Sequence, residues 1–289
     1  MAAVACSAKD AGPEVDPSRV VDELLEADRS YAAAAAGTNV IDGIAAFLAT
    51  NVWMPAAGTF YSGRASALEY LRANADNLAG HLEWAPVRGG VSADGQHGFT
   101  FGFMTLVRPD SPSVPLKYLA YWVNGADGWK AVAYKRARRA AGAGSTVMVP
   151  PSLPPQLVPV NTDSAAAARY EQALGDAERA FSDLAGEIGL GPAFQRNAAP
   201  DAMNMGGPQD AGFVYGPEAI GSAVGAGREG PSALSWGSDH VIVASSGDLG
   251  VSIGHIVIPG DAGAPSRRVP FFTIWRRDSP AAPWRFVAE

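Results

Sequence analysis

The chain has little cysteine and no excess of basic residues. Cys6 is the single cysteine among 289 residues, which excludes an intramolecular disulfide and a zinc site built on cysteine pairs. The 22 Lys and Arg residues are outnumbered by 29 Asp and Glu, for a formal net charge of -7. A protein that neutralises phosphates needs the opposite balance, so the composition argues against a nucleic-acid partner. No apolar run approaches the ~20 residues of a transmembrane segment.

Motifs that mark common cofactor and metal sites are also missing. The chain has no Gly-x-x-x-x-Gly-Lys loop and no His-Glu-x-x-His pair. Gly189 and Gly191 lack the third glycine of a dinucleotide-binding loop. His81 and Glu83 have the spacing of two metal ligands, but a third ligand is missing. We therefore expect no metal and no cofactor.

The strongest pattern in the chain is an internal repeat. The glycine-rich run 95–102 recurs as 247–254, an offset of 152 residues (95 to 247). Three tryptophans recur at similar offsets, and the matched pairs are Trp84 and Trp236, Trp122 and Trp275, and Trp129 and Trp284. Small drifts in the offset are what loop insertions leave between two copies of one unit. The repeat predicts two copies of one fold.

Each copy has helices first and strands afterwards. Apolar periodicity predicts helices over 19–36, 40–48 and 65–79, and again over 165–184, 191–197 and 217–226. Alternating patterns with Asp-Gly turns predict strands over 82–91, 98–107, 116–124 and 129–136, and again over 234–244, 250–258, 269–276 and 284–287. This order predicts the α+β class: three helices packed on a curved, four- to six-stranded antiparallel sheet in each copy.

The composition also predicts the domain boundaries. Residues 1–17 are expected to be an N-terminal tether, 18–140 the first domain, 141–162 a linker and 163–289 the second domain. The linker contains five prolines and favours an extended conformation of ~3.1 Å per residue. In this conformation the linker is long enough for the two copies to pair within one chain. We expect such a self-paired arrangement, in a monomer or a dimer.

The residues around Cys6 resemble the end of a bacterial lipoprotein signal, in which the cysteine is lipidated. The polar segment after Cys6 has the composition of a tether. This favours a periplasmic or lipid-anchored protein of the cell envelope, with a cytoplasmic protein as the alternative.

Several short segments of both copies resemble the SnoaL-like branch of the nuclear transport factor 2-like superfamily, a group of small and mostly uncharacterised bacterial domains. The matching segments are Asn51-Val-Trp-Met54, Tyr61-Ser-Gly-Arg64, the hairpin 246–250 with Gly254, Tyr118 to Trp122, and the tryptophans near the ends of both copies. Their order, repeated twice, supports the resemblance more than any single segment does.

The resemblance implies a cone-shaped domain whose mouth holds a small apolar ligand, or a cofactor-independent isomerase, cyclase or dehydratase. The acidic residue that the family commonly has after its second helix is Asp201 in the second copy and Asn51 in the first. A general base at that place is therefore implied for the second copy only.

Strand alternation adds two histidines to the candidate site. With a hairpin turn at 245–248, His255 is expected opposite Ser238 and His240 opposite Ile253, all on one face together with Trp236. Imidazole is well suited to proton transfer near neutral pH. The alternative is that both histidines form local hydrogen bonds or face water.

We therefore expect His255, His240 and Asp201 to be the catalytic candidates. The expected ligand pocket is lined mainly by aromatic residues, which also occur in ordinary cores: Trp236, Ser238, Ile253, Trp53, Tyr61, Trp84, Phe101, Phe103 and Tyr121.

Three functions remain open from the sequence. The first is binding of a small apolar or aromatic molecule. The second is a cofactor-independent isomerase, cyclase or dehydratase with a histidine general base in the second domain. The third is a non-catalytic structural or interaction module of the cell envelope. The first copy has Arg88, Phe103 and Asn51 where the second has His240, His255 and Asp201, so polar recognition is expected in the second copy.

Overall fold

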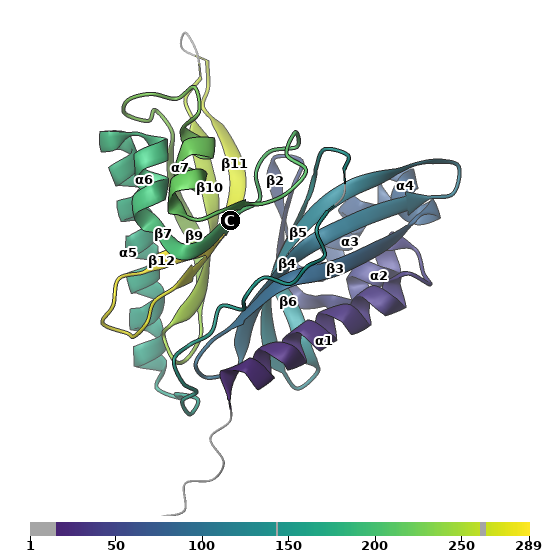
Figure 1. The fold of residues 1–289 in the computed structure, drawn as a ribbon, viewed down its shortest axis with the longest axis horizontal. Coiled ribbons are helices and arrows are strands. Elements are labelled where there is room, and N and C mark those ends of the chain that lie inside the picture. Colours follow the sequence, from purple (N-terminus) through teal and green to yellow (C-terminus); the bar gives the residue numbers. More distant parts are fainter. Residues whose placement is uncertain (1–15, 143, 261–263) are drawn as a thin grey trace, which may run out of the picture.

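Each half of the chain forms a six-stranded sheet with helices on one face (Figure 1). The computed structural model describes residues 16–142, 144–260 and 264–289. Cys6 and most of the expected tether lie outside the described residues. None of the helices in these ranges is long and apolar enough to cross a membrane.

The first domain contains four helices and six strands. They are α1 (Pro17–Ala35), α2 (Val40–Phe47), β1 (Leu48–Ala56), β2 (Thr59–Ser62), α3 (Arg64–Arg72), α4 (Ala75–Ala79), β3 (His81–Val91), β4 (His97–Arg108), β5 (Ser111–Gly125) and β6 (Gly128–Arg138). The expected single helix over 65–79 is two helices, because Asn74 caps a new one: its side chain accepts a hydrogen bond from the Asp76 backbone N–H.

The second domain repeats this order. Its elements are α5 (Ser164–Ile188), α6 (Leu190–Asn197), β7 (Ala198–Asn204), β8 (Val214–Tyr215), α7 (Pro217–Gly225), β9 (Ser235–Val243), β10 (Leu249–Ile258), β11 (Arg267–Arg276) and β12 (Arg285–Ala288). The strand orders, β2-β1-β6-β5-β4-β3 and β8-β7-β12-β11-β10-β9, are the same. The α+β class and the two-domain arrangement are therefore confirmed.

Both sheets are mixed, whereas the sequence predicted antiparallel sheets. β1 lies parallel to β6, and β7 lies parallel to β12. In each domain the second helix leads directly into the strand that enters the sheet beside the last one. The connection between these parallel strands contains all the other strands of the domain, so the order of helices and strands alone does not reveal it.

A β-bulge at the same place in both domains changes which side chains share a face. The register shifts between Pro86 and Arg88 in β3 and between Ser238 and His240 in β9. The expected pair of His240 with Ile253 is present, but His255 pairs with Gly237 and not with Ser238. A bulge inserts one residue and reverses the alternation beyond it. Trp236 and Ser238 therefore lie on the opposite face from His240 and His255.

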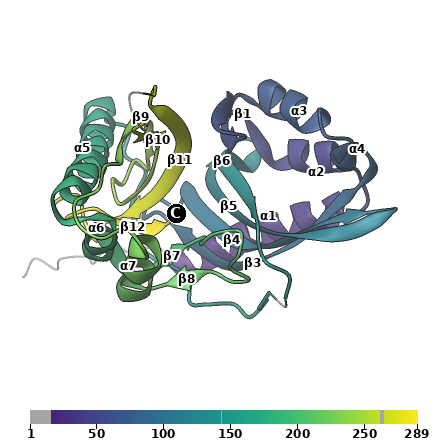
Figure 2. The same cartoon turned by 90° about the horizontal axis from the view of Figure 1, so that it is seen from above.

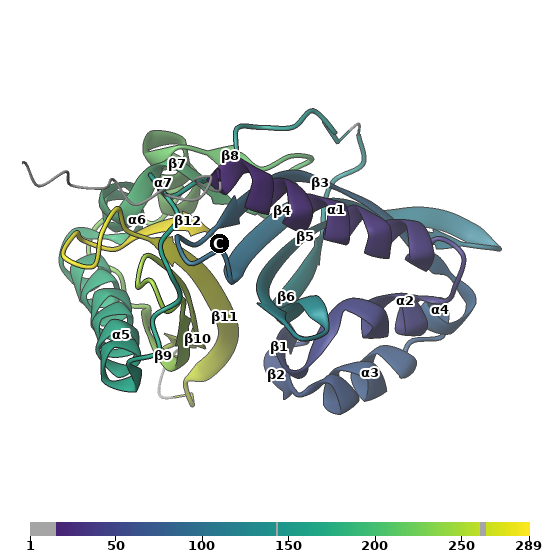
Figure 3. The same cartoon turned by 90° about the horizontal axis from the view of Figure 1, so that it is seen from below.

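The two domains pack through the sheet faces that the helices leave uncovered. Figures 1, 2 and 3 show the helices on the outside and β10 and β11 facing the strands of the first domain. Phe101 and Leu119 of the first domain and Ile253 and Phe272 of the second are fully buried in one continuous cluster. This is the intramolecular pseudo-dimer that the sequence predicted.

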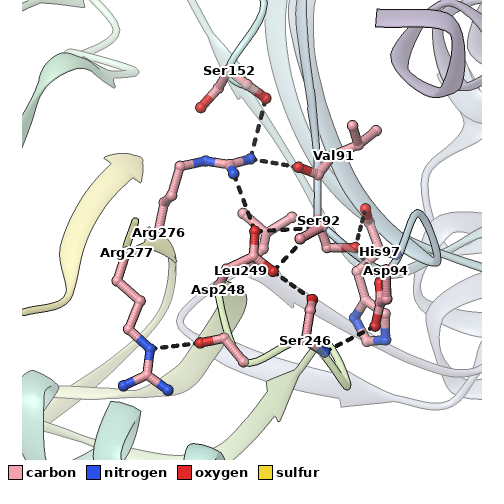
Figure 4. Close-up of polar contacts among 12 residues, drawn as sticks. Val91, Ser92, Asp94, His97, Ser152, Ser246, Asp248, Leu249, Arg276 and Arg277 are labelled. Atoms are coloured by element: carbon pink, nitrogen blue, oxygen red, sulfur yellow. Dashed lines mark hydrogen bonds and ion pairs between the residues drawn. The ribbon is translucent and has the colours of Figure 1, made fainter. Parts of the chain in front are cut away.

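The contacts between the domains are reciprocal, as an approximate twofold axis requires. At the β3–β4 turn, Asp94 accepts hydrogen bonds from Ser245 and Ser246 of the β9–β10 turn. In the opposite direction, Asp248 accepts from the Ala93 backbone N–H at 3.1 Å. Figure 4 shows these turns and Arg276, which donates to the carbonyls of Val91 and Ser152.

The segment between the domains runs beside β3. The backbone N–H groups of Val149 and Ser152 donate to the carbonyls of Val87 and Gly89, and Ser152 forms a parallel bridge with Gly90. The proline-rich chain is therefore an extended strap along the edge of the first sheet.

Candidate functional site

An apolar cavity lies inside the cone of the second domain, between its helices and the helix-covered face of its sheet. It has a volume of about 190 Å³. Its walls come from α5, α6, α7, β9, β10, β11 and the loop before β9. The lining residues are Glu178, Phe181, Leu190, Phe194, Val224, Arg228, Leu234, Trp236, Ile256, Phe271, Thr273 and Glu289.

Glu178 of α5 is the most strongly bonded polar group of this wall. It is fully buried. Its Oε1 accepts a hydrogen bond from Trp236 Nε1 at 2.7 Å, and its Oε2 accepts from Trp275 Nε1 at 3.1 Å and from the Ser252 hydroxyl. Burial nevertheless raises the pKa of Glu178 to about 7. A carboxyl group that titrates near neutral pH therefore lies at the wall of an apolar cavity.

Ser252 lies in a Gly-x-Ser-x-Gly pattern, Gly250 to Gly254. In hydrolases this pattern forms a turn between a strand and a helix. Here all five residues lie within β10, and the Ser252 hydroxyl donates to Glu178. Ser252 therefore positions the carboxyl group and has no nucleophile geometry.

The first domain has an equivalent carboxyl group, Asp28 of α1, 150 residues earlier (28 to 178). Asp28 is buried and accepts hydrogen bonds from Trp84 Nε1 and from the Tyr118 hydroxyl, both at 2.7 Å. Burial raises the pKa of Asp28 as well. In both domains this hydrogen-bonded acid joins the first helix to the sheet.

The interior of the first domain is packed with aromatic rings around that acid. The Phe47 ring lies 5.8 Å from Trp84, 5.7 Å from Trp122 and 5.1 Å from Tyr134. Tyr118 and Phe271 occupy equivalent positions, because they pair with Gly102 and Gly254. The positions of Phe47 and Tyr134 are occupied by Asn197 and Glu289 in the second domain, at offsets of 150 and 155 residues (47 to 197 and 134 to 289).

The predicted catalytic residues lie on the opposite face of the sheet from this cavity, between the domains. The His240 ring packs against Trp53 in a tilted arrangement, with centroids 4.1 Å apart. His255 Nδ1 lies 2.5 Å from Asp239, and its ring packs 5.2 Å from Phe60. The β9 bulge explains the difference from the expected site, because it places Trp236 on the opposite face of the sheet from both histidines.

Asp201 pairs with Arg88 of the first domain, the residue that corresponds to His240. The Arg88 side chain is almost completely buried. Asp201 is thus part of the domain contact and is not among the residues that line the cavity.

The predicted pocket residues divide between the two faces. Trp236 lines the cavity, and Trp84 has the equivalent place in the first domain. Ser238 faces α5, where its hydroxyl lies beside Gly175. Tyr61 stacks on Tyr70 on the outside of the first domain's core. The others pack in the cluster that joins the domains, namely Ile253, Trp53, Phe101, Phe103 and Tyr121.

Sequence reasoning missed Asp28, Glu178 and Glu289. The available signal was that Asp28 and Glu178 lie four residues after a buried leucine, Leu24 or Leu174, and match at the offset of the repeat. An acid on an apolar helix stripe in both copies indicates a buried, hydrogen-bonded carboxyl group. No group of three metal-ligating side chains gathers within the described ranges.

The stability of the protein should depend on the protonation of Glu178. Its pKa is about 7 in the folded protein, against an ordinary value of 4.5, so the folded state binds the proton more tightly. The free energy of unfolding should therefore fall as pH rises from 5 to 8, by up to about 3 kcal/mol. Urea denaturation of the wild type and of Glu178→Gln should show a steeper fall in the wild type, because Glu289 keeps its own raised pKa in both proteins. Parallel pH profiles for the two proteins would contradict the assignment.

No family model and no curated protein matches the sequence. Similar solved structures include an aromatic ring hydroxylase-like protein of Novosphingobium aromaticivorans, described as putative, with 18% identity and a TM-score of 0.35, covering 45% of this chain and 96% of that one. A ketosteroid isomerase-like protein of Erwinia carotovora has 14% identity and a TM-score of 0.33, covering 42% and 97%. An NTF-2 like protein of unknown function from Shewanella oneidensis has 13% identity and a TM-score of 0.32, covering 42% and 98%.

Each match spans a little under half of this chain, which is the length of one domain. The helices, the mixed six-stranded sheet and its strand order are present twice. The chain is therefore a tandem pair of α+β domains that share one strand order.

Proposed function

We propose that the second domain binds one small, largely apolar molecule in its cone, and that the first domain supports the pair. The main support for this proposal is the apolar cavity of about 190 Å³ beside the buried Glu178. A dry, apolar cavity of about 150 Å³ accepts benzene. The cavity of the second domain therefore suits a molecule with one ring and a few further heavy atoms.

The composition of the walls supports an apolar or aromatic ligand. Phe181, Phe194, Trp236 and Phe271 present rings to the cavity, and rings favour offset or edge contacts with a bound ring. In the first domain, the aromatic packing around Phe47 occupies the corresponding interior. Binding by the second domain alone follows from this difference.

Acid–base catalysis is the second candidate, with Glu178 in the role that the sequence gave to the histidines. A carboxyl group with a pKa of about 7 exchanges its proton readily near neutral pH. Glu178 lines the cavity, so a substrate of the proposed size would lie beside it. A cofactor-independent isomerase, cyclase or dehydratase uses chemistry of this kind.

Thermal shifts against a panel of one-ring hydrophobic molecules test the binding proposal. A ligand at 100 times its dissociation constant stabilises the folded state by about 2.7 kcal/mol. Val224 lines the cavity, so Val224→Phe should fill part of it and abolish the shift. The control Val160→Phe makes the same change at an exposed position between the domains. This control should show the same thermal shift with the ligand as the wild type.

If no molecule of the panel shifts the wild type, the binding and catalytic proposals both fail, and an interaction module remains. If Val224→Phe keeps the full shift, the ligand binds elsewhere and the proposed site is wrong. Turnover that is lost in Glu178→Gln while binding is kept would favour the enzyme.

A further inference from the structure

Glu289 is the unusual residue of the cavity wall. Its Oε2 atom is buried and has no hydrogen-bond partner among the described residues. Glu289 lines the cavity together with Glu178. Its backbone is fixed, because its N–H donates to the Met203 carbonyl and its carbonyl accepts from the Met205 N–H. A buried acceptor without a donor is costly unless a bound group supplies one.

The first domain has no comparable acceptor at the equivalent position. Tyr134 stands there, and it is fully packed among the rings of the core, with its hydroxyl 3.7 Å from the sulfur of Met104. The carboxyl group of Glu289 is thus specific to the domain that has the cavity. Packing alone does not explain it, because an apolar or aromatic residue fills this place in the other copy.

Glu289 forms no direct ion pair among the described residues. Burial raises its pKa, while the charge of Lys135 lowers it and the charge of Glu178 raises it. Glu178 bears the same charge and is occupied by three donors. Lys135 of β6 is the cation whose charge acts on the pKa of Glu289. Its ammonium, however, donates to the Phe272 carbonyl at 3.2 Å and lies over the Phe272 ring. Arg228 lies at the exposed edge of the cavity and donates to the Val224 carbonyl.

We propose that the ligand of this cavity is an apolar amine, and that Glu289 Oε2 accepts a hydrogen bond from its protonated nitrogen. This inference rests on the proposed binding function and names the ligand class. The apolar walls would hold the ring or alkyl body, while an ammonium group would supply the donor that Oε2 lacks. A charge-assisted hydrogen bond of this kind is stronger than a neutral one.

Calorimetric titration with two probes of nearly equal size tests the inference. Benzylamine carries the ammonium group and toluene does not. At pH 8 we expect benzylamine to bind at least about tenfold more tightly than toluene. Glu289→Gln should lower the affinity for benzylamine about tenfold and change that for toluene less than about twofold. Glu187→Gln, an exposed change on α5, should alter neither.

The wild type alone gives a second readout that does not depend on the variant folding. Burial raises the pKa of both Glu178 and Glu289 to about 7, so these groups lose their protons between pH 6 and 8. The ratio of benzylamine to toluene affinity should rise across this range, while benzylamine itself stays protonated.

The outcomes separate the two proposals. If toluene binds and benzylamine is not preferred, or if the preference does not depend on pH, the amine inference is overturned and apolar binding stands. If neither probe binds, the proposed function is overturned together with the inference.

Discussion

Replacing Lys117 by methionine should lower the free energy of unfolding by about 3 kcal/mol, through loss of the contact between the domains. Lys117 of β5 is fully buried. Its ammonium donates to the carbonyls of Met205, Asp210 and Gly212 in the loop between β7 and β8. Methionine has a similar length, but it leaves these carbonyls without their donor.

Urea denaturation followed by tryptophan fluorescence measures this effect. The control Arg138→Met removes a charge from an exposed position of β6 and should change the stability by less than about 0.5 kcal/mol. We expect the Lys117 variant to unfold at a lower urea concentration, and the two domains to unfold in separate transitions and not in one. A loss below about 1 kcal/mol would show that the ammonium does not hold the domains together.

Glu178→Leu should cost about 3 to 5 kcal/mol at pH 5, where the carboxyl group is protonated and its burial carries no charge penalty. Leucine has a similar size but cannot accept the hydrogen bonds of Trp236, Trp275 and Ser252. Trp236 Nε1 would then lack its acceptor, Trp275 Nε1 would keep only the Ser252 hydroxyl, and Ser252 would keep only the longer bond to the Thr273 carbonyl. At pH 8 the loss should be smaller, because ionised Glu178 destabilises the wild type.

The same substitution at the exposed Glu187 of α5 is the matched control for helix propensity and charge. It should change the free energy of unfolding by less than about 0.5 kcal/mol at either pH. Equal costs for the two substitutions would mean that the hydrogen bonds of Glu178 contribute nothing to stability.

The repeat carried most of the fold information in the sequence. The shared offsets matched Trp84 with Trp236 and the β4 glycines with those of β10, and these residues have the same structural role in both domains. The pairing of the two copies within one chain was also predicted, from the repeat and the length of the linker. Helix and strand bounds differ from the expected ones by a few residues, apart from the helix that Asn74 divides.

The face of each side chain was harder to predict because it depends on the bulges. One inserted residue, Asp239, moves Trp236 to the helix-covered face while His240 stays on the domain contact. Strand alternation does not reveal such an insertion. The position of Glu289 in the cavity also depends on a bulge, since the register shifts between the pairs of β11 with β12.

The site was missed for a different physical reason. An acid on a helix is usually solvated, and only its tertiary partners show that Glu178 is a buried acceptor. Its donors include Trp236, which was expected in the pocket wall, and Trp275, which the sequence matched to Trp122 through the repeat. The buried carboxyl group proposed here for the second domain therefore comes from a helix, and the predicted histidines lie on strands at the opposite face of the sheet.

Magnetisation transfer between a bound aromatic probe and methyl groups of the protein tests the central claim most directly. With toluene as the probe, we expect nuclear Overhauser contacts to methyl groups of Leu190, Leu234 and Ile256, which line the cavity of the second domain. We expect none to Ile44 or Leu82, which are buried in the core of the first domain. Contacts to the first domain's core, or to no methyl group of the cavity, would contradict the account.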